Sequence, residues 1–419
     1  MNLRPSRDGS PGREYWHLAV GIVACLWAFT AGQLNAAEPG VGITDTWVAT
    51  DGLGREVATH AKAGGPRAER TVGIFYFLWL GVHGYDRLDD PGRDFDDDQG
   101  VQPKERPEHR YRSPYVLTDI LRENPHEPEY GPIPSWHFAE KPQFGFYLSD
   151  DRYVFRKHLA QLGNAGVDVL LIDVTNAYTY RANYLALLEE MERMEALGSP
   201  VPKIAFVVNT RSKETVERLY REFYAKGLHR DRWFPWEGKP LILAPPEGHS
   251  PEIADFFTFR RSWAFTHVNP AAANVGWFED GQHKWPWIDL YPQGYGWDED
   301  PAKAEAMAVA PASHPLNNVG RSHDGERQPP PGERATSQGV YFGKQWERAL
   351  AVDPEFIFLT GWNEWVATTQ VHGKPHRPPA MMGESLEEGD VYFVDKYNSE
   401  FSRDIEPSRE PPLADHYYY

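Results

Sequence analysis

From Thr71 onward, short apolar runs alternate with longer amphipathic stretches, and this alternation strongly limits the folds open to the chain. Several runs are continuously apolar, which is typical of parallel strands covered on both faces. Strands are predicted at Val72–Trp79, Asp168–Val174, Lys203–Asn209, Pro240–Ala244, Phe257–Phe265, Trp287–Tyr291, Ala306–Ala312 and Glu355–Thr360. Helices are predicted at Arg152–Ala165, Ala182–Leu197, Lys213–Lys226 and Tyr341–Ala351.

Strands that alternate with helices in this way indicate an α/β fold, a (β/α)8 TIM barrel over residues 71–410. A doubly wound open sheet is the main alternative, but no glycine-rich phosphate loop supports it. Long insertions in the βα loops are expected at 82–150, after the first strand, and in the proline-rich segment 313–337. Such loops at the carboxyl ends of barrel strands usually shape the substrate cleft.

The N-terminus has the pattern of a secretory signal peptide over residues 1–36. Three arginines precede an apolar run at Leu18–Ala31, and small residues lead to a cleavage site near Ala36. The run is too short for a comfortable membrane span. Cys25 lies in a lipobox-like sequence, but ordinary cleavage is favoured because apolar residues continue past it. The mature chain is expected to be secreted, or periplasmic in a bacterium, with no membrane span.

The predicted barrel lies between two short flanking segments. Residues 37–70 are expected to be a lead-in segment, and residues 411–419 a tail after which the natural protein continues. Cys25 is the chain's one cysteine, so the mature protein has no thiol for disulfides or cysteine catalysis. The net charge of -18 with no basic run argues against nucleic acid as a partner. The 14% aromatic content suits a protein that presents flat faces to carbohydrate.

The last predicted strand ends in Trp362-Asn363-Glu364-Trp365. A carboxylate between two indoles is a common way to build a sugar-cleaving site. Glu364 is predicted to be catalytic, Asn363 to hold a sugar hydroxyl, and Trp362 and Trp365 to stack on a pyranose ring. The alternative is a strand end with a solvated glutamate and core tryptophans.

A glycosidase needs a second carboxyl group across the scissile bond. Asp173 is the first candidate, because it ends an otherwise apolar strand where a buried charge is costly unless it is used or paired. The alternative is a carboxylate paired with a lysine or arginine inside the barrel. Glu279 and Asp280, in a loop, and Asp289, on the sixth strand, are further candidates.

Other side chains at strand ends are predicted to bind substrate. The alternatives for them are core aromatics, turn or cap residues, and local structural hydrogen bonds. They are Tyr76, Trp79, Asn176, Asn209, Tyr291, Gln293 and His314. No cofactor is predicted. Asp94, Asp96 and Asp98 form a candidate calcium loop, although their spacing departs from the EF-hand register and a solvated acidic turn is the commoner outcome.

Three segments resemble the glycoside hydrolase family 71/99-like (WbsX-like) group: Val72–Trp79, Gly166–Asp173 and Gly361–Trp365. This group includes endo-α-mannosidases and fungal α-1,3-glucanases. The resemblance implies a (β/α)8 barrel with a retaining carboxylate mechanism over about residues 70–410. The endo-mannosidase members carry a second glutamate three residues after the first, and that position is Ala367 here. The second acid of this chain must therefore come from elsewhere.

The sequence as a whole predicts a secreted glycoside hydrolase that acts on a polysaccharide or glycan by a two-carboxylate mechanism. A non-catalytic carbohydrate-binding barrel is one alternative, motivated by Ala367. A WbsX-like protein associated with glycosyl transfer is another. It is disfavoured because an export signal removes the chain from cytoplasmic sugar nucleotides.

Overall fold

A computed structural model describes residues 49–65, 67–80, 136–138, 140–263, 281–313, 318–371, 380–381, 384–385, 391–393, 399–409 and 414–419. Several predicted features lie outside these residues: the signal peptide, the loop acids Glu279 and Asp280, His314, and the calcium candidates Asp94, Asp96 and Asp98.

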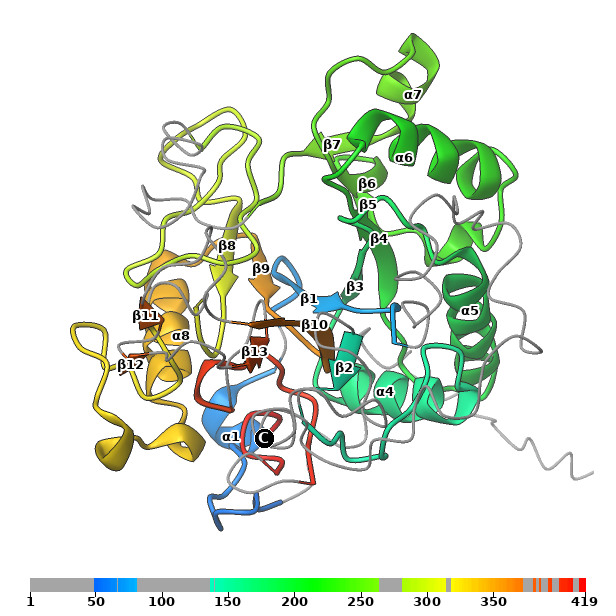
Figure 1. Ribbon diagram of the computed structural model, residues 1–419. Coiled ribbons are helices and arrows are strands. Elements are labelled where there is room, and N and C mark those ends of the chain that lie inside the picture. Colours follow the sequence, from blue (N-terminus) through cyan, green and yellow to red (C-terminus); the bar gives the residue numbers. More distant parts are fainter. Residues whose placement is uncertain are drawn as a thin grey trace, which may run out of the picture. The chain divides into compact units, whose positions relative to one another are not determined.

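Seven strands of the central sheet are parallel to their neighbours. They lie side by side in the order β7, β6, β4, β3, β1, β9, β8 (Figure 1). Their bounds are β1 Thr71–Tyr76, β3 Val169–Asp173, β4 Lys203–Val207, β6 Lys239–Leu243, β7 Thr258–Arg260, β8 Ala306–Val309 and β9 Phe356–Leu359. The short β5 (Pro235–Trp236) adds to β6 in the antiparallel sense.

An irregular segment fills the position between β7 and β8 along the chain. The Trp285 N–H donates to the carbonyl of Arg261 at 2.7 Å, and the Trp287 N–H donates to that of Trp263 at 3.0 Å. Eight parallel segments therefore follow one another in chain order, and β9 lies beside β1. This order is that of a (β/α)8 barrel, so the predicted fold is confirmed. The sixth strand, expected at Trp287–Tyr291, instead pairs over residues 283–287 and forms no regular ladder.

Helices lie between the strands as the sequence indicates. Asp151 caps the first long helix by accepting from the N–H groups of Tyr153 and Val154. Gly166, at φ 75°, turns the chain from that helix into β3. The helices are α1 His60–Ala63, α4 Arg152–Asn164, α5 Arg181–Ala196, α6 Ser212–Leu219, α7 Pro251–Phe256 and α8 Val340–Val352, with a π-helical turn η5 at Tyr220–Tyr224. Short 3-10 turns are η6 Arg230–Arg232, η8 Pro331–Glu333, η9 Thr336–Gln338 and η10 Ser399–Phe401.

After β9 the chain forms small antiparallel sheets. Strand β10 pairs with both β2 and β13, and β11 pairs with β12. Their bounds are β2 Trp136–Phe138, β10 Val366–Val371, β11 Ala380–Met381, β12 Glu384–Ser385 and β13 Val391–Phe393. Within the described ranges, no helix combines the length and apolar character that a membrane span requires.

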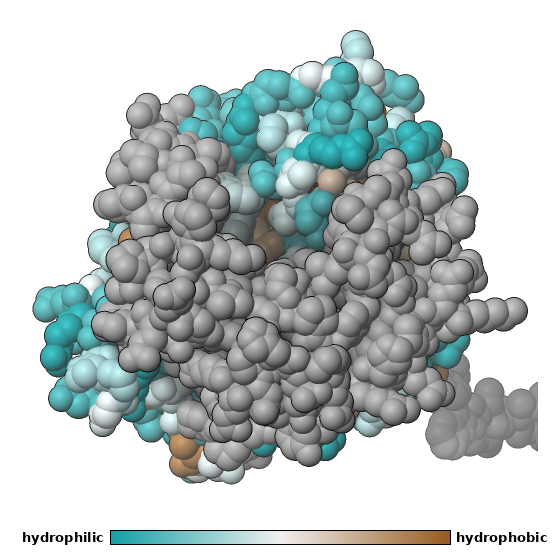
Figure 2. All heavy atoms as spheres, viewed as in Figure 1, coloured by the Kyte–Doolittle hydropathy of each residue, from teal (hydrophilic) through white to brown (hydrophobic). Residues whose placement is uncertain are grey.

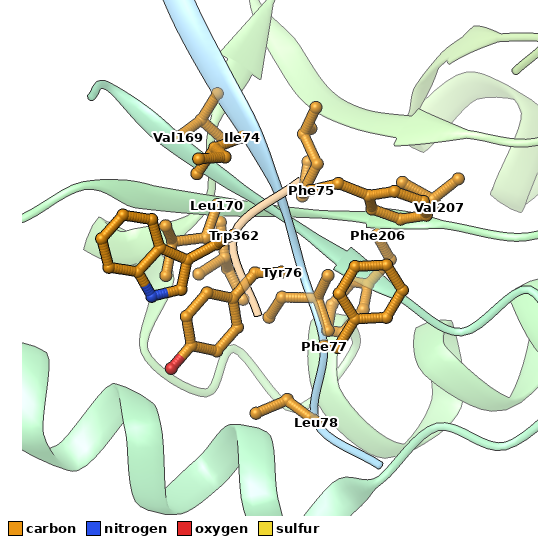
Figure 3. Packing of buried hydrophobic residues seen from close by; sticks show 14 of the residues in the cluster. Ile74, Phe75, Tyr76, Phe77, Leu78, Val169, Leu170, Phe206, Val207 and Trp362 are labelled. Atoms are coloured by element: carbon orange, nitrogen blue, oxygen red, sulfur yellow. The ribbon is translucent and has the colours of Figure 1, made fainter. Parts of the chain in front are cut away.

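Large aromatic side chains fill the barrel. Phe75 of β1 contacts Phe358 of β9 and Trp287, with ring centroids 5.7 and 5.5 Å apart. Side chains alternate along a strand, so Tyr76 points to the opposite side of β1. Figure 3 shows this arrangement, with Tyr76 and Trp362 on one side of the β1 ribbon and Phe75 and Phe77 on the other.

Residues 399–409, here called the closing segment, lie along the chain that leaves β9. The Gly361 N–H donates to the Arg403 carbonyl at 2.8 Å, and the N–H groups of Ile405 and Glu406 donate to the carbonyls of Gly361 and Trp362, both at 3.1 Å. These bonds extend strand pairing beyond the end of β9. The residues that follow β9 are therefore held between β1 and the closing segment.

Candidate active site

Glu364 and Asp173 lie at the same end of the barrel, on the two strands that flank β1. The register pairs Tyr76 with Ile172, which places the next residue, Phe77, level with Asp173. Asn363 contacts the backbone of the same Phe77 from the other side. Two strand spacings separate β9 from β3, so the two backbones are roughly 10 Å apart. This is the carboxyl end of the strands, where barrel enzymes carry their catalytic groups.

The Glu364 carboxylate is nearly buried and ion-paired. The Nη2 atom of Arg403 lies 3.0 Å from its Oε2 atom, and the two side chains are 2% and 7% exposed. The Arg403 guanidinium lies 5.8 Å from the centre of the Trp287 ring, whose other neighbour, Phe75, is inside the barrel. The guanidinium therefore lies between the Glu364 carboxylate and a ring that packs on the barrel interior. Its own N–H donates to Oδ1 of Asp404.

Asp173 is 2% exposed and is the last residue of β3. It shares a face of the sheet with Val169, which lies beside the Cα of Gly73 inside the barrel, so its side chain also faces inward. Its Oδ1 atom accepts from the N–H of Thr175 at 3.1 Å, a turn that starts the following loop. Asp173 thus faces the interior at the carboxyl end of the barrel, the end at which the chain leaves β9 toward Glu364.

The amide of Asn363 has a structural role in this conformation. Its Oδ1 accepts from the Phe77 N–H at 2.9 Å, and its Nδ2 donates to the Phe77 carbonyl at 3.1 Å and to the hydroxyl of Tyr147 at 3.3 Å. These bonds replace the backbone pairing that ends with β9. The amide predicted to hold a sugar hydroxyl is therefore occupied by β1.

Trp362 and Trp365 are completely buried, so their faces pack against protein and are not presented to a ligand here. The indole N–H of Trp365 donates to Oε2 of Glu406. Trp362 packs edge-on against His158 of α4, with centroids 5.6 Å apart. The interpretation of these indoles as core residues, rather than as a sugar platform, fits the structure.

Tyr76 belongs to a buried polar network between β1, α4 and the closing segment. Its hydroxyl lies 2.8 Å from Nδ1 of His158, whose Nε2 lies 3.0 Å from Oε1 of Glu406. Tyr147 donates to Oε2 of the same glutamate at 2.7 Å. Burial, together with the Glu406 charge, raises the pKa of Tyr76 and that of Tyr147 well above the usual tyrosine range, so both hydroxyls remain protonated donors. Tyr76 faces the helices rather than the predicted sugar site.

The remaining predicted residues are spread around the barrel mouth. Trp79 follows β1 and packs on Phe77 with centroids 5.1 Å apart. Asn176 is half-buried and donates to the hydroxyl of Tyr180 at 2.5 Å. Asn209 follows β4 and is exposed, so it remains accessible. These residues all follow the carboxyl ends of their strands, and Figure 2 shows a recess in the viewed face of the molecule with apolar described residues at its base.

The stretch that follows the irregular sixth segment is engaged in local contacts. Gln293 is buried and donates to the carbonyls of Ala308 and Gln345 at 3.1 and 2.9 Å. Asp289 is buried and accepts from the Gly294 N–H at 2.8 Å, and the half-buried Tyr291 precedes a cis proline. Gln293 thus anchors α8 to β8, and Asp289 closes a turn.

Arg403 and Trp287 were missed by the sequence analysis. Arg403 lies 39 residues after Glu364 in the chain, and only the folded closing segment brings it to the site. The available sequence signal was the charged stretch Arg403-Asp-Ile-Glu406. In the structure its three charged residues are all under 4% exposed. Trp287 lies two residues after Trp285, so in an extended segment both side chains point to the same side. In the part of the chain that the structure describes, no group of three or more metal-ligating side chains is arranged to hold a metal ion.

No family model and no curated protein sequence matches the chain. Among solved structures, it is similar to a GH99 endo-alpha-mannosidase from Bacteroides thetaiotaomicron, at 16% identity and a TM-score of 0.42, over 83% of this chain and 94% of that one. The same enzyme in complex with BIS-TRIS-Propane gives a TM-score of 0.41 at 16% identity, over 83% and 93%. A glycoside hydrolase-like protein gives 0.39 at 12% identity, over 85% and 95%. Such values describe a distant structural likeness, and the barrel assignment rests on the strand order of this chain.

Proposed function

We propose that the protein is a glycoside hydrolase that cleaves glycosidic bonds of a polysaccharide or glycan, with Glu364 and Asp173 as its two carboxylates. The placement of the two groups supports the proposal: Asp173 ends β3, Glu364 follows β9, and both of these strands flank β1 at the carboxyl end of the barrel. Backbones roughly 10 Å apart let the carboxyl groups approach to the 5–9.5 Å or so that a scissile bond requires.

The surroundings of the two groups support different roles. A guanidinium 3.0 Å from Glu364 favours its ionised form. Glu364 is accordingly proposed as the nucleophile or base, which acts as an anion. Asp173, the last residue of β3, faces the interior from the other side of β1. Asp173 is therefore proposed as the proton donor to the leaving oxygen. The predicted export signal would place this activity outside the cytoplasm.

Conservative substitutions test the assignment. Glu364→Gln and Asp173→Asn should each lower kcat/KM by roughly 10²- to 10⁴-fold on any glycan that the wild type cleaves. The measurement is reducing-end release from a panel of α-linked polysaccharides. Glu347→Gln, an exposed change on α8, is the matched control and should leave the rate unchanged. Near wild-type activity of Glu364→Gln would end the assignment.

A non-catalytic carbohydrate-binding barrel is the second candidate. Ala367, at the position of the second family glutamate, is 2% exposed in β10 and pairs with His137 of β2, where a carboxylate would be buried in a sheet. This candidate expects glycan binding by the wild type without any product release, and equal binding by Glu364→Gln. Calorimetry with the same panel separates it from the enzyme.

A further inference from the structure

The closing segment is fixed beside Glu364 by another buried arginine. Arg321 is fully buried, and its Nε and Nη2 atoms donate to the carbonyls of Ser402 and Asp404 at 2.8 and 2.5 Å. Arg403 lies between these two anchored carbonyls. Its backbone position is therefore set independently of its side-chain contact with Glu364.

Glu400 anchors the other end of the same stretch. Its carboxylate accepts from the N–H and hydroxyl of Ser322 at 2.7 and 2.8 Å, from Gln328 at 2.8 Å and from Thr336 at 2.6 Å. A carboxylate with four donors is held firmly. The loop that contains Ser322, Gln328 and Thr336 thereby fixes the closing segment against the barrel.

Asp404 completes the contact with the catalytic strand end. Its Oδ1 accepts from the Glu364 N–H, while its Oδ2 accepts from the Ser402 hydroxyl at 3.4 Å. One oxygen therefore bonds the main chain of Glu364 and the other bonds the side chain of Ser402, and this is why Asp404 is not assigned as the second catalytic carboxylate. Asp404 thus fixes the main chain of Glu364, and the preceding residue, Arg403, contacts its side chain.

We propose that Arg403 is a positioning residue for the reaction: its guanidinium keeps Glu364 ionised and directed into the barrel mouth, and the closing segment is thus part of the active site. This inference rests on the proposed function. The Arg403 guanidinium contacts both the Glu364 carboxylate and the ring of Trp287. An ion pair with a purely structural role would not need the second contact. Removing one partner of a buried pair leaves the other charge uncompensated.

The charged groups around this strand end give the direction of the effect. Arg403 and Asp404 face Glu364 from the closing segment, Asp173 faces the interior from β3, and Glu406 with His158 lies behind Trp362 and Trp365. Among these, Arg403 is the permanent cation in contact with the Glu364 side chain. Among the groups that the structure describes here, its loss removes a cation and leaves the Asp404 carboxylate in place, so we expect the Glu364 anion to form only at higher pH.

Two substitutions separate charge from packing. Arg403→Gln keeps a long polar side chain without the cation, and the acid limb of its kcat/KM profile should move up by about 1–3 pH units. Arg403→Lys keeps a cation, so its acid limb should stay near that of the wild type. Its kcat should fall, because an ammonium group lacks the planar set of donors with which the guanidinium holds Glu364. Arg409→Gln is the control, because Arg409 belongs to the same segment and bonds the Gln143 carbonyl at 2.7 Å, away from Glu364. Its profile should not move.

The outcomes identify which statement fails. If the wild type cleaves a glycan and Glu364→Gln does not, but Arg403→Gln leaves the acid limb in place, the role of Arg403 is wrong and the proposed function stands. Equal shifts in Arg403→Gln and Arg403→Lys also contradict it, because charge would then be irrelevant. If Glu364→Gln retains full activity, the assignment of Glu364 fails and the role of Arg403 fails with it; if the wild type cleaves no glycan of the panel, the proposed function itself fails. Circular dichroism at each pH identifies a variant that has unfolded. If Arg403→Gln unfolds, the acid limb and kcat of Arg403→Lys alone test the role of Arg403.

Discussion

Asn363 shows how one side chain can continue a sheet beyond its last strand. Its amide offers an acceptor and a donor to the two polar backbone groups of Phe77, at 2.9 and 3.1 Å, as an adjacent strand would. Asn363 is 1% exposed, so neither group of Phe77 can turn to water instead. The orientation of the neighbouring Glu364 depends on this clamp.

Replacing Asn363 by alanine should cost about 1–3 kcal/mol in the free energy of unfolding, since two buried backbone groups lose their partner. Urea denaturation measures the change. Asn209→Ala, at an exposed position after β4, is the control and should stay close to the wild type. A loss in Asn363→Ala no larger than in that control would contradict the structural role.

At this scale the sequence placed Glu364 and Asp173 on the right strand ends but did not give the roles of their neighbours. Side-chain alternation predicts orientation within a strand, and it fails where the strand ends. Trp362 and Trp365 point into packed surroundings because the chain after β9 is held between β1 and the closing segment. Nothing local in Trp-Asn-Glu-Trp encodes a partner 39 residues later.

Helix α8 ends in an ion-pair junction with the start of β1. Asp353 caps the helix in the left-handed region, at φ 56°, and its two oxygens receive Arg70 at 2.9 and 2.7 Å and Arg67 at 2.7 Å. The bonds from Arg70, followed by its charge, lower the pKa of Asp353 to about 2. A helix and a strand far apart in sequence are tied together here.

The sign of the linkage follows from that lowered pKa. A carboxyl group with a depressed folded-state pKa stabilises the protein above its unfolded pKa of about 3.9, and this contribution is lost as the pH falls toward 2. Asp353→Asn should therefore be less stable than the wild type at pH 7 and converge with it between pH 4 and about 2. Asparagine tolerates the left-handed conformation, so the backbone is not the cause.

Guanidinium chloride screens ion pairs, so urea is the proper denaturant for this comparison. The exposed Asp255→Asn on α7 provides the matched control. A gap between wild type and Asp353→Asn that stays constant from pH 7 to pH 2 would rule out the linkage.

The sequence predicted the individual helices and strands best. The helices were placed to within a few residues because caps such as Asp151 and stops such as Gly166 act locally. The strands were found from their continuous apolar runs. The sixth was misplaced because its segment alternates tryptophan and proline and pairs, within the described residues, through only three bonds, two with Arg261 and one with Trp263. Its position depends on the neighbouring strands and not on its own composition.

The whole barrel closes where β1 meets β9, and Gly73 makes that closure possible. A Cβ atom on Gly73 would lie 2.4 Å from Cζ of Phe356 and 3.0 Å from Cγ1 of Val169. The Phe356 ring cannot move away easily, because Trp285 lies 4.4 Å from it and Trp236 and Phe234 lie within 6.1 Å. At this seam, where β1 meets β9, the barrel interior therefore has room for the backbone of residue 73 but not for a side chain.

Gly73→Ala should thus destabilise the molecule by about 1–3 kcal/mol through overpacking. The urea midpoint should fall while the m-value stays constant, because the surface exposed on unfolding is unchanged. Gly332→Ala, where a Cβ atom would meet nothing within 4 Å, is the control. If both glycine variants unfold at the wild-type midpoint, the seam is looser than the structure indicates.

The connection between Glu364 and Arg403 also sets an order of events in the cell. A chain is synthesised from its N-terminus, and barrel strands can begin to assemble before synthesis is complete. When Glu364 has left the ribosome, its partner Arg403 is still 39 residues from being available. A nascent barrel therefore contains the carboxylate without its cation, and the proposed hydrolytic activity would arise late, after the closing segment has emerged and docked.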